Sequence, residues 1–181
     1  MIIKNIVQIG NPILSQQSEP VKDIKSAKTK QVIKNLTDFL RYHQLIGLAS
    51  SQIGSKDKIF VTEVRKTPYR NPNSIDKLRI YINPQITWMS KKQIIIYEGC
   101  GSVAYAKLFG PVKRPEKITI KALDKNGLPF TLKASGLLSR VIQHEYDHLF
   151  GIEFTEKITD YRKIMSSEEY QKSLNSSAES A

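Results

Sequence analysis

The sequence is poor in several residue types and patterns, and each absence excludes something. Its 181 residues include a single cysteine, Cys100, so no internal disulfide can form and the fold needs no oxidising compartment. No apolar run approaches the roughly 20 residues that a membrane-spanning helix needs. The start of the chain lacks a basic cluster and a small-residue cleavage site, so we expect no signal peptide. These absences predict a cytoplasmic protein without a membrane partner.

Positive charge, by contrast, is plentiful. The chain has 28 Lys and Arg against 17 Asp and Glu, a formal net charge of +11. Such a balance favours polyanionic partners such as nucleic acid or the ribosome. The basic residues are spread along the chain, however, and no specific DNA or RNA motif is present. We therefore expect a solvated basic surface, leave ribosome association open, and keep a nucleic-acid binder as an alternative that charge alone supports.

Length and composition are typical of one globular domain. With 40% hydrophobic and 25% charged residues the chain can bury a core, and no linker or repeat divides it. We predict a single domain over residues 1–160 and a C-terminal tail, 161–181, that is partly helical or disordered. Apolar periodicity predicts helices over 26–42 and 135–150, and Gly151 is placed to end the second.

The pattern of most of the remaining chain predicts short β-strands separated by turns. Asn126-Gly127 predicts a hairpin turn and Asn83-Pro84 another turn of the chain. Segment 103–115 contains Gly110-Pro111 and Pro115, which predicts a loop. The expected strands are residues 58–64, 78–82, 85–89, 93–97, 117–123 and 130–134.

The second expected helix carries a chemical signal, the sequence His144-Glu145-Tyr146-Asp147-His148. Positions i and i+4 of a helix lie roughly 40° apart on one face, so two imidazoles there could hold one metal ion. The glutamate between them could then reach a water molecule at that metal. The alternative is a pair of surface histidines. Because the chain has only three histidines and this helix is rich in apolar residues, we favour the metal site.

A metal site of this kind needs a third ligand, and the sequence offers two sources. Glu153 and Glu156 lie downstream, where zinc peptidases usually place theirs, but Gly151 should end the helix before them. Upstream, Cys100 lies between two glycines at the end of a β-rich run, and a thiolate is a strong ligand. One cysteine and two histidines would leave a fourth tetrahedral position open for water. A metallopeptidase with a downstream ligand is the alternative.

Three short motifs follow one another in the chain: LIGLASSQ (45–52), EGCGS (98–102) and QHEYDHLFG (143–151). Together they resemble the peptide deformylase family. That family carries Gly-x-Gly-Leu-Ala-Ala-x-Gln, Glu-Gly-Cys-Leu-Ser and Gln-His-Glu-x-Asp-His-x-x-Gly in the same order. The resemblance extends from about Gly10 to Phe154, and three motifs in order are highly specific.

The chain departs from the family pattern at several positions, none of which removes a ligand. They are Leu45 for Gly, Ser50 for Ala, Gly101 for the Leu usual in bacterial members, and Val103-Ala104 for Ile-Pro. The segment CGSVAY and Arg140 are closer to the mitochondrial-type branch. These differences bear on rate and substrate preference more than on reaction type.

The resemblance implies an α+β fold, with antiparallel β-sheets packed around the second helix and a further helix near the N-terminus. It also implies a metal-dependent hydrolase that removes the N-formyl group from N-formyl-methionyl peptides of newly made proteins. Formylated nascent peptides would be its partners. A water molecule activated by the metal would be the nucleophile, and Glu145 the general acid/base.

The same resemblance assigns roles to individual residues. The implied metal ligands are Cys100, His144 and His148. The implied oxyanion donors are the Gln52 side chain and the Gly101 backbone N–H. Backbone groups near Gly47 would align the peptide as an added strand. Candidates for the methionine pocket are Ile46, Leu137 and Val141, which could equally be core residues.

Three questions stay open at this point. The family often uses Fe(II), but one cysteine and two histidines also suit Zn(II), Ni(II) or Co(II). Asp147 could orient a ligand, pair with Arg114, or be a surface carboxylate. The departures at Gly101 and Ala104 also allow a divergent homologue with an altered substrate or no activity.

Overall fold

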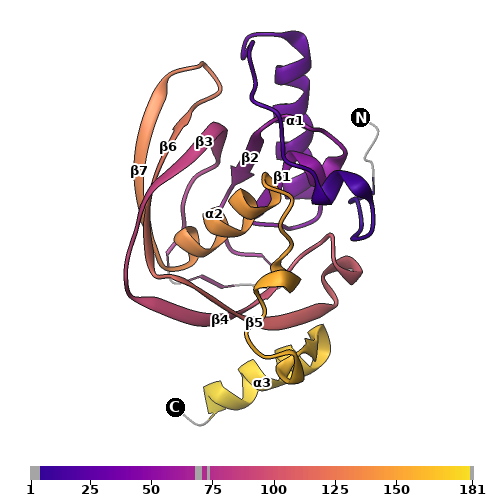
Figure 1. The fold of residues 1–181 in the computed structure, drawn as a ribbon. Helices are drawn as coiled ribbons and strands as arrows, with labels where there is room; N and C mark the ends of the chain where they lie inside the picture. The colour runs from indigo at the N-terminus through magenta and orange to yellow at the C-terminus, as the bar shows by residue number, and fades with distance from the viewer. Residues whose placement is uncertain (1–4, 68–70, 73, 180–181) are drawn as a thin grey trace.

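The computed structural model describes residues 5–67, 71–72 and 74–179. Two antiparallel sheets enclose a central helix, α2 (Gly136–His148), so the implied α+β architecture is confirmed (Figure 1). Helix α1 (Ala27–Tyr42) lies at the top of the view in Figure 1, and α3 (Ser167–Glu179) lies below the smaller sheet. Within the described residues, no helix is both long and apolar enough to cross a membrane.

The larger sheet has five strands in the order β1-β2-β3-β6-β7. Side chains of β2 alternate between its faces, because successive residues of a strand point to opposite sides. Ile59 and Val61 pack in one apolar cluster with α1, whereas Phe60 packs in another with Ile142 of α2. The strands are β1 (Gly47–Ala49), β2 (Ile59–Thr62), β3 (Arg79–Met89), β6 (Lys117–Leu123) and β7 (Pro129–Ser135).

The turn expected at Asn83-Pro84 is wrong, because both residues lie inside the long strand β3. The register of β3 on β6 shifts between Ile82 and Gln85, which marks a bulge. Asn83 has a positive φ of 50°, a conformation that asparagine tolerates better than most residues. Its side-chain amide donates to the carbonyl of Val21 and accepts from the backbone N–H of the same residue. Through these two hydrogen bonds the bulge holds the segment around Val21 against the larger sheet.

The smaller sheet has the strand order β4-β5-β8. Its strands are β4 (Gln93–Gly99), β5 (Leu108–Pro115) and β8 (Met165–Ser166). The loop expected over 103–115 is therefore wrong from residue 108 onward. Strand β5 tolerates Pro111 and Pro115 because these residues point their backbone away from β4. The carbonyls of Pro111 and Pro115 accept from Thr159 and Gln143 on that outer side, where the missing proline N–H groups break no bond to β4.

Both predicted helices are confirmed, and each end has a local cause. The side chain of Ser26 caps α1 by accepting from the backbone N–H of Thr29. Gly151 follows α2 with a left-handed φ of 70°. A Cβ atom at Gly151 would lie 2.5 Å from the backbone carbon of Ser15, so glycine is required there for space as well.

The chain after the core continues as an ordered segment. Short 3-10 turns at Phe154–Lys157 and Tyr161–Lys163 lead into β8 and α3. The ring of Tyr170 on α3 stacks on Phe109 at 4.6 Å and on Tyr97 at 5.4 Å between ring centroids. The tail expected to be partly helical or disordered contains the helix α3 up to Glu179, and residues 180–181 lie outside the described residues.

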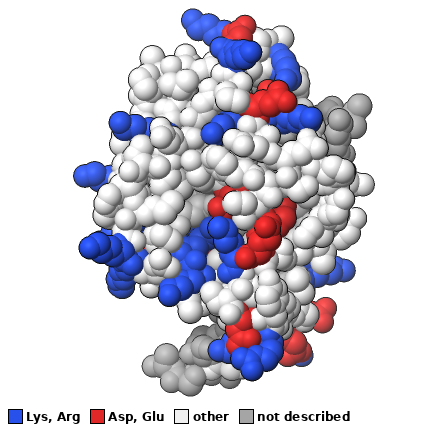
Figure 2. Space-filling view, viewed as in Figure 1, with Lys and Arg blue, Asp and Glu red and all other residues white. Residues whose placement is uncertain are grey.

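Surface charge follows the even spread of basic residues along the chain. On the face shown in Figure 2, Lys and Arg side chains form separate patches, the largest at lower left of centre. Asp and Glu side chains lie between them (Figure 2).

Candidate active site

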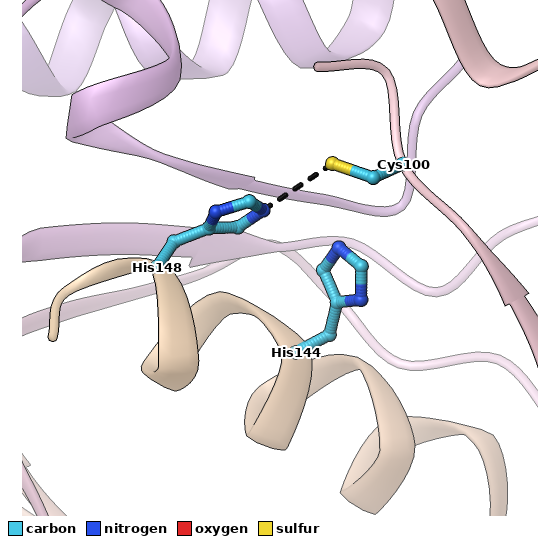
Figure 3. A group of neighbouring side chains, drawn as sticks. All are labelled: Cys100, His144 and His148. Atoms are coloured by element: carbon cyan, nitrogen blue, oxygen red, sulfur yellow. Dashed lines mark hydrogen bonds between the residues drawn. The ribbon is translucent and has the colours of Figure 1, made fainter. Parts of the chain in front are cut away.

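The structure brings together the three side chains expected to hold a metal. His144 and His148 project from adjacent turns of α2 toward Cys100, which follows the end of β4 (Figure 3). The Cys100 Sγ lies 3.3 Å from the His148 Nε2, and one ligand atom from each of the three residues lies within 4.8 Å of the others. Cys100 and His148 are only 2% and 1% exposed, so water competes little for these ligand atoms.

The ligand atoms suit a divalent metal ion in type, direction and charge. Nδ1 of each histidine faces a carboxylate, Glu98 for His144 and Glu153 for His148, which leaves each Nε2 for a metal. Burial raises the pKa of the Cys100 thiol, but the two histidines outweigh burial and lower it to about 6. The residues present therefore favour a thiolate and a cation at this point, as a metal site of one cysteine and two histidines requires.

Glu98, the penultimate residue of β4, is the centre of a buried ionic network. It pairs with Arg114 of β5 at 2.7 Å and Arg140 of α2 at 2.9 Å, and its Oε2 lies 3.0 Å from the His144 Nδ1. Burial alone would raise the pKa of Glu98, but His144 and Arg114 hold it well below its usual range. Arg114 also pairs with Asp147 at 2.6 Å, which settles the position of that carboxylate.

Arg140 connects the helix to both long strands of the smaller sheet. Its guanidinium donates to the backbone carbonyl of Ile94 in β4 at 2.9 Å and to that of Val112 in β5 at 3.0 Å. Because these bonds have fixed directions, they hold α2 at one rotation about its own axis. This rotation aims the histidines at Cys100.

Gln52 lies against the sulfur of Cys100. Its Oε1 accepts from the backbone N–H of Ala49 at 2.8 Å, and its Nε2 donates to the Cys100 Sγ at 3.3 Å and to the Ser102 Oγ at 3.2 Å. The amide is therefore held with its donor side toward the ligand set.

Glu145 approaches the edge of the larger sheet beside the two histidines. It can do so only because residue 47 is glycine: a Cβ there would overlap the Glu145 carboxylate and lie 2.6 Å from a methyl group of Val141. Burial raises the pKa of Glu145 to about 7, although the neighbouring histidines lower it. A carboxyl group that changes protonation near neutral pH can both accept and return a proton.

Gly101 is covered by the N-terminal segment. A Cβ at Gly101 would lie 2.6 Å from the Cδ1 of Ile6, so the Ile6 side chain takes the space next to this glycine. The side chain of Gln8 donates to the Gly101 carbonyl at 2.9 Å.

A cleft opens onto the site, with a volume of about 170 Å³. It is comparable with a cavity of about 150 Å³ that binds benzene, so one side chain of medium size could enter. Apart from buried His148, every expected site residue lines the cleft: Ile46, Gly47, Gln52, Cys100, Gly101, Leu137, Val141, His144 and Glu145.

Several residues of the site were not expected from the sequence. Glu98 could have been found, because it belongs to the same short motif as Cys100. Arg140 bonds to strands more than 25 positions away in the chain, and Phe109 and Tyr170 reach the cleft from a segment expected to be a loop and from the tail. The positions of Arg140 and Phe109 at the site depend on strand register, and that of Tyr170 depends on the path of the tail; the sequence pattern predicted neither.

Comparisons with known proteins agree with this geometry. The chain matches the family model described as polypeptide deformylase over residues 3–163. The peptide deformylase of Treponema pallidum (strain Nichols) is 36% identical over 155 residues, which cover 86% of this chain and 88% of that protein. Peptide deformylase 1 of Ralstonia nicotianae is 31% identical over 163 residues, 90% of each protein.

Solved structures give the same result. The peptide deformylase of Ehrlichia chaffeensis superposes with a TM-score of 0.77 at 29% identity, covering 87% of this chain and 89% of that one. The Met-Ala-Ser-bound class I type b peptide deformylase of Acinetobacter baumannii gives 0.80 at 26% identity, covering 84% and 96%.

Fold and site thus define an enzyme of the hydrolase class. With the family model matched over most of its length, the chain belongs to the polypeptide deformylase family.

Proposed function

We propose that this protein removes the formyl group from N-formyl-methionyl peptides of newly made proteins. The observation that carries the proposal is the Glu145 carboxylate beside a buried Cys100, His144 and His148 set, in a cleft of a family member. Held by those three side chains, a divalent metal would activate water and polarise the formyl carbonyl. The family resemblance favours Fe(II), and the same ligands suit Zn(II), Ni(II) or Co(II).

Glu145 is the proton carrier in this proposal. Its carboxylate accepts a proton from the attacking water and gives it to the amine that leaves when the formyl C–N bond breaks. A pKa of about 7 supports both steps, because neither protonation state is strongly disfavoured near neutral pH. Burial of the Glu145 side chain keeps bulk water from exchanging this proton.

Gln52 and Gly101 stabilise the negative charge that develops on the formyl oxygen. The bond from the Ala49 N–H fixes the Gln52 amide so that its NH₂ group points toward Cys100. A donor that is already oriented loses little free energy in the transition state. The backbone N–H of Gly101 is the second donor, and the Ile6 and Gln8 contacts hold that part of the loop in place.

The substrate peptide binds along the edge strand β1, and the methionine side chain enters the cleft. β1 ends the order of the larger sheet, so backbone groups on one side of Gly47 are available to a peptide. Leu137 is half-buried and faces the cleft, whereas Ile46 and Val141 are 7% and 6% exposed and serve the core as well. The Met-Ala-Ser peptide in the A. baumannii relative supports this class of ligand.

The metallopeptidase alternative loses its downstream ligand in this arrangement. Glu153 faces Nδ1 of His148, whereas Cys100 faces Nε2 of the same ring. Glu156 accepts a hydrogen bond from the backbone of Glu153. Neither carboxylate belongs to the ligand set, which favours Cys100 as the third ligand.

We extend the proposal to nascent chains at the ribosome in the cytoplasm, where formylated termini first appear.

The test is formate release from formyl-Met-Ala-Ser by anaerobically purified protein, with metal content measured on the same sample. We expect turnover in the wild type and loss of both metal and turnover in Cys100→Ala. A wild-type protein that is fully loaded with metal yet releases no formate would refute the proposal and indicate a divergent homologue.

A further inference from the structure

Glu153 is a buried carboxylate with one clear neighbour. It follows α2 beyond Gly151 and is 5% exposed. Its Oε1 lies 3.3 Å from the Nδ1 of His148. Within the described residues, neither Glu153 oxygen makes a hydrogen bond, and neither does that Nδ1. A buried carboxylate whose oxygens make no hydrogen bond is costly, so the ion pair of Glu153 with His148 calls for a physical explanation.

The backbone holds Glu153 at this place from both sides. Gly151 packs directly against the backbone of Ser15, and the N–H of Glu153 donates to the Glu156 Oε1 at 2.8 Å. The next residue, Phe154, is buried, and its ring stacks on His144 with a centroid distance of 6.2 Å. The segment therefore places the buried Glu153 side chain beside His148 and away from solvent.

The direction of the His148 ring explains why a carboxylate lies beside it. Its Nε2 points toward Cys100, where a metal would be held, so its Nδ1 carries the proton and needs an acceptor. A carboxylate at that position fixes the tautomer, orients the ring and strengthens the nitrogen as a ligand. His144 already has such a partner in Glu98, at 3.0 Å.

We propose that Glu153 is a positioning residue for the metal, accepting the Nδ1–H of His148 as Glu98 does for His144. The inference rests on the proposed metal centre, and it adds a second carboxylate–histidine pair to it. The two carboxylates differ in their ion pairs: Glu98 is shared with Arg114 and Arg140, whereas in the described part of the chain Glu153 pairs with His148. The negative charge of Glu153 therefore acts mainly on the ligand set, where it favours retention of a cation.

The test compares metal affinity in Glu153→Gln and Glu156→Gln. Both replace a carboxylate of the same turn by an amide of equal shape, but only Glu153 faces His148. We expect Zn(II) or Co(II) to bind Glu153→Gln about 10- to 100-fold more weakly, measured by competition with a chelating indicator. Glu156→Gln keeps an amide oxygen that can accept from the Glu153 N–H, so it should bind metal as the wild type does. Glu153→Asp, which keeps the charge, should lie closer to the wild type than Glu153→Gln.

Two results would overturn the inference: wild-type affinity in Glu153→Gln, or an equal loss in Glu156→Gln, which would assign the effect to the turn and not to the carboxylate. Thermal unfolding of each metal-free variant checks that folded protein is compared. Because affinity is measured without substrate, absence of deformylation would leave this inference intact. Wild-type protein that binds no metal, or binds it equally well as Cys100→Ala, would instead refute the metal centre itself.

Discussion

Helix α2 meets the two sheets through two unlike faces. Toward the larger sheet it presents Ile142, which is fully buried against the cluster that contains Phe60, Tyr81 and Ile118. Toward the smaller sheet it presents Arg140 and Asp147, which enter the ionic network around Glu98. Apolar contacts depend on area and hardly on angle, whereas hydrogen-bonded ion pairs depend on both distance and direction.

The two faces of α2 therefore have different roles: one stabilises the packing of the helix and the other sets its orientation. Burial of the apolar face stabilises the packing of the helix on the larger sheet, and the ionic face selects one rotation about the helix axis. A third stripe carries His144 and Glu145, which line the cleft, and His148, which is buried one turn further along. In the proposed function this stripe carries the chemistry. Substitutions on the three stripes should therefore give three distinguishable results.

The largest effect is expected on the cleft stripe. Glu145→Gln removes the proposed proton acceptor, so turnover of formyl-Met-Ala-Ser should fall about 10²- to 10⁴-fold, measured as formate release. Metal content and the urea midpoint should change little, because the amide has the same shape. Full activity in this variant would exclude Glu145 as the acid/base.

The next effect is expected on the ionic face. Glu98→Ala leaves Arg114 and Arg140 buried without their shared carboxylate, which should lower the free energy of unfolding by about 3–5 kcal/mol. Metal affinity should also fall, because His144 loses the acceptor for its Nδ1. Urea denaturation and chelator competition measure the two effects. A variant with lowered stability but unchanged affinity would contradict the orienting role of this face.

A smaller effect is expected on the apolar face. Ile142→Val removes one buried methylene group and should lower the free energy of unfolding by about 0.5–1.5 kcal/mol. In the folded protein, metal affinity and turnover should match the wild type, because no directed bond is changed. Loss of metal in this variant would show that packing, too, sets the rotation of α2.

The smallest effect serves as a control for Glu98. Glu116 forms an ion pair with Lys92 at 3.1 Å, but the lysine side chain is 69% exposed. Glu116→Ala should change the free energy of unfolding by about 1 kcal/mol or less, since solvent screens such pairs. If Glu116→Ala lowered the free energy of unfolding as much as Glu98→Ala does, the buried ion pairs would contribute no more to stability than the surface pair.

Local patterns in the sequence predict α2 and the shared direction of its two histidines well, because helix periodicity and the His144–His148 spacing lie within one element. Cys100 could be identified because it is the only cysteine of the sequence and lies within the motif EGCGS. Strand β5 could not be predicted, because Pro111 and Pro115 fit in a strand only where their backbone nitrogens face away from the ladder with β4. That orientation depends on the register of the two strands. The Glu98 network depends on the register of β4 on β5, and the wall formed by Tyr170 depends on the path of the tail back to the cleft.

The N-terminal segment has a practical consequence for making the protein. The N–H of Val7 donates to the Gln52 carbonyl at 2.9 Å, and that of Ile9 donates to the Ser102 carbonyl at 2.7 Å. These few residues thus join the two loops that border Cys100. A shortened version that begins beyond Ile9 would retain the three recognisable motifs and lose the link between two of them, so expression vectors should preserve this start and carry purification tags that are cleaved without trimming it.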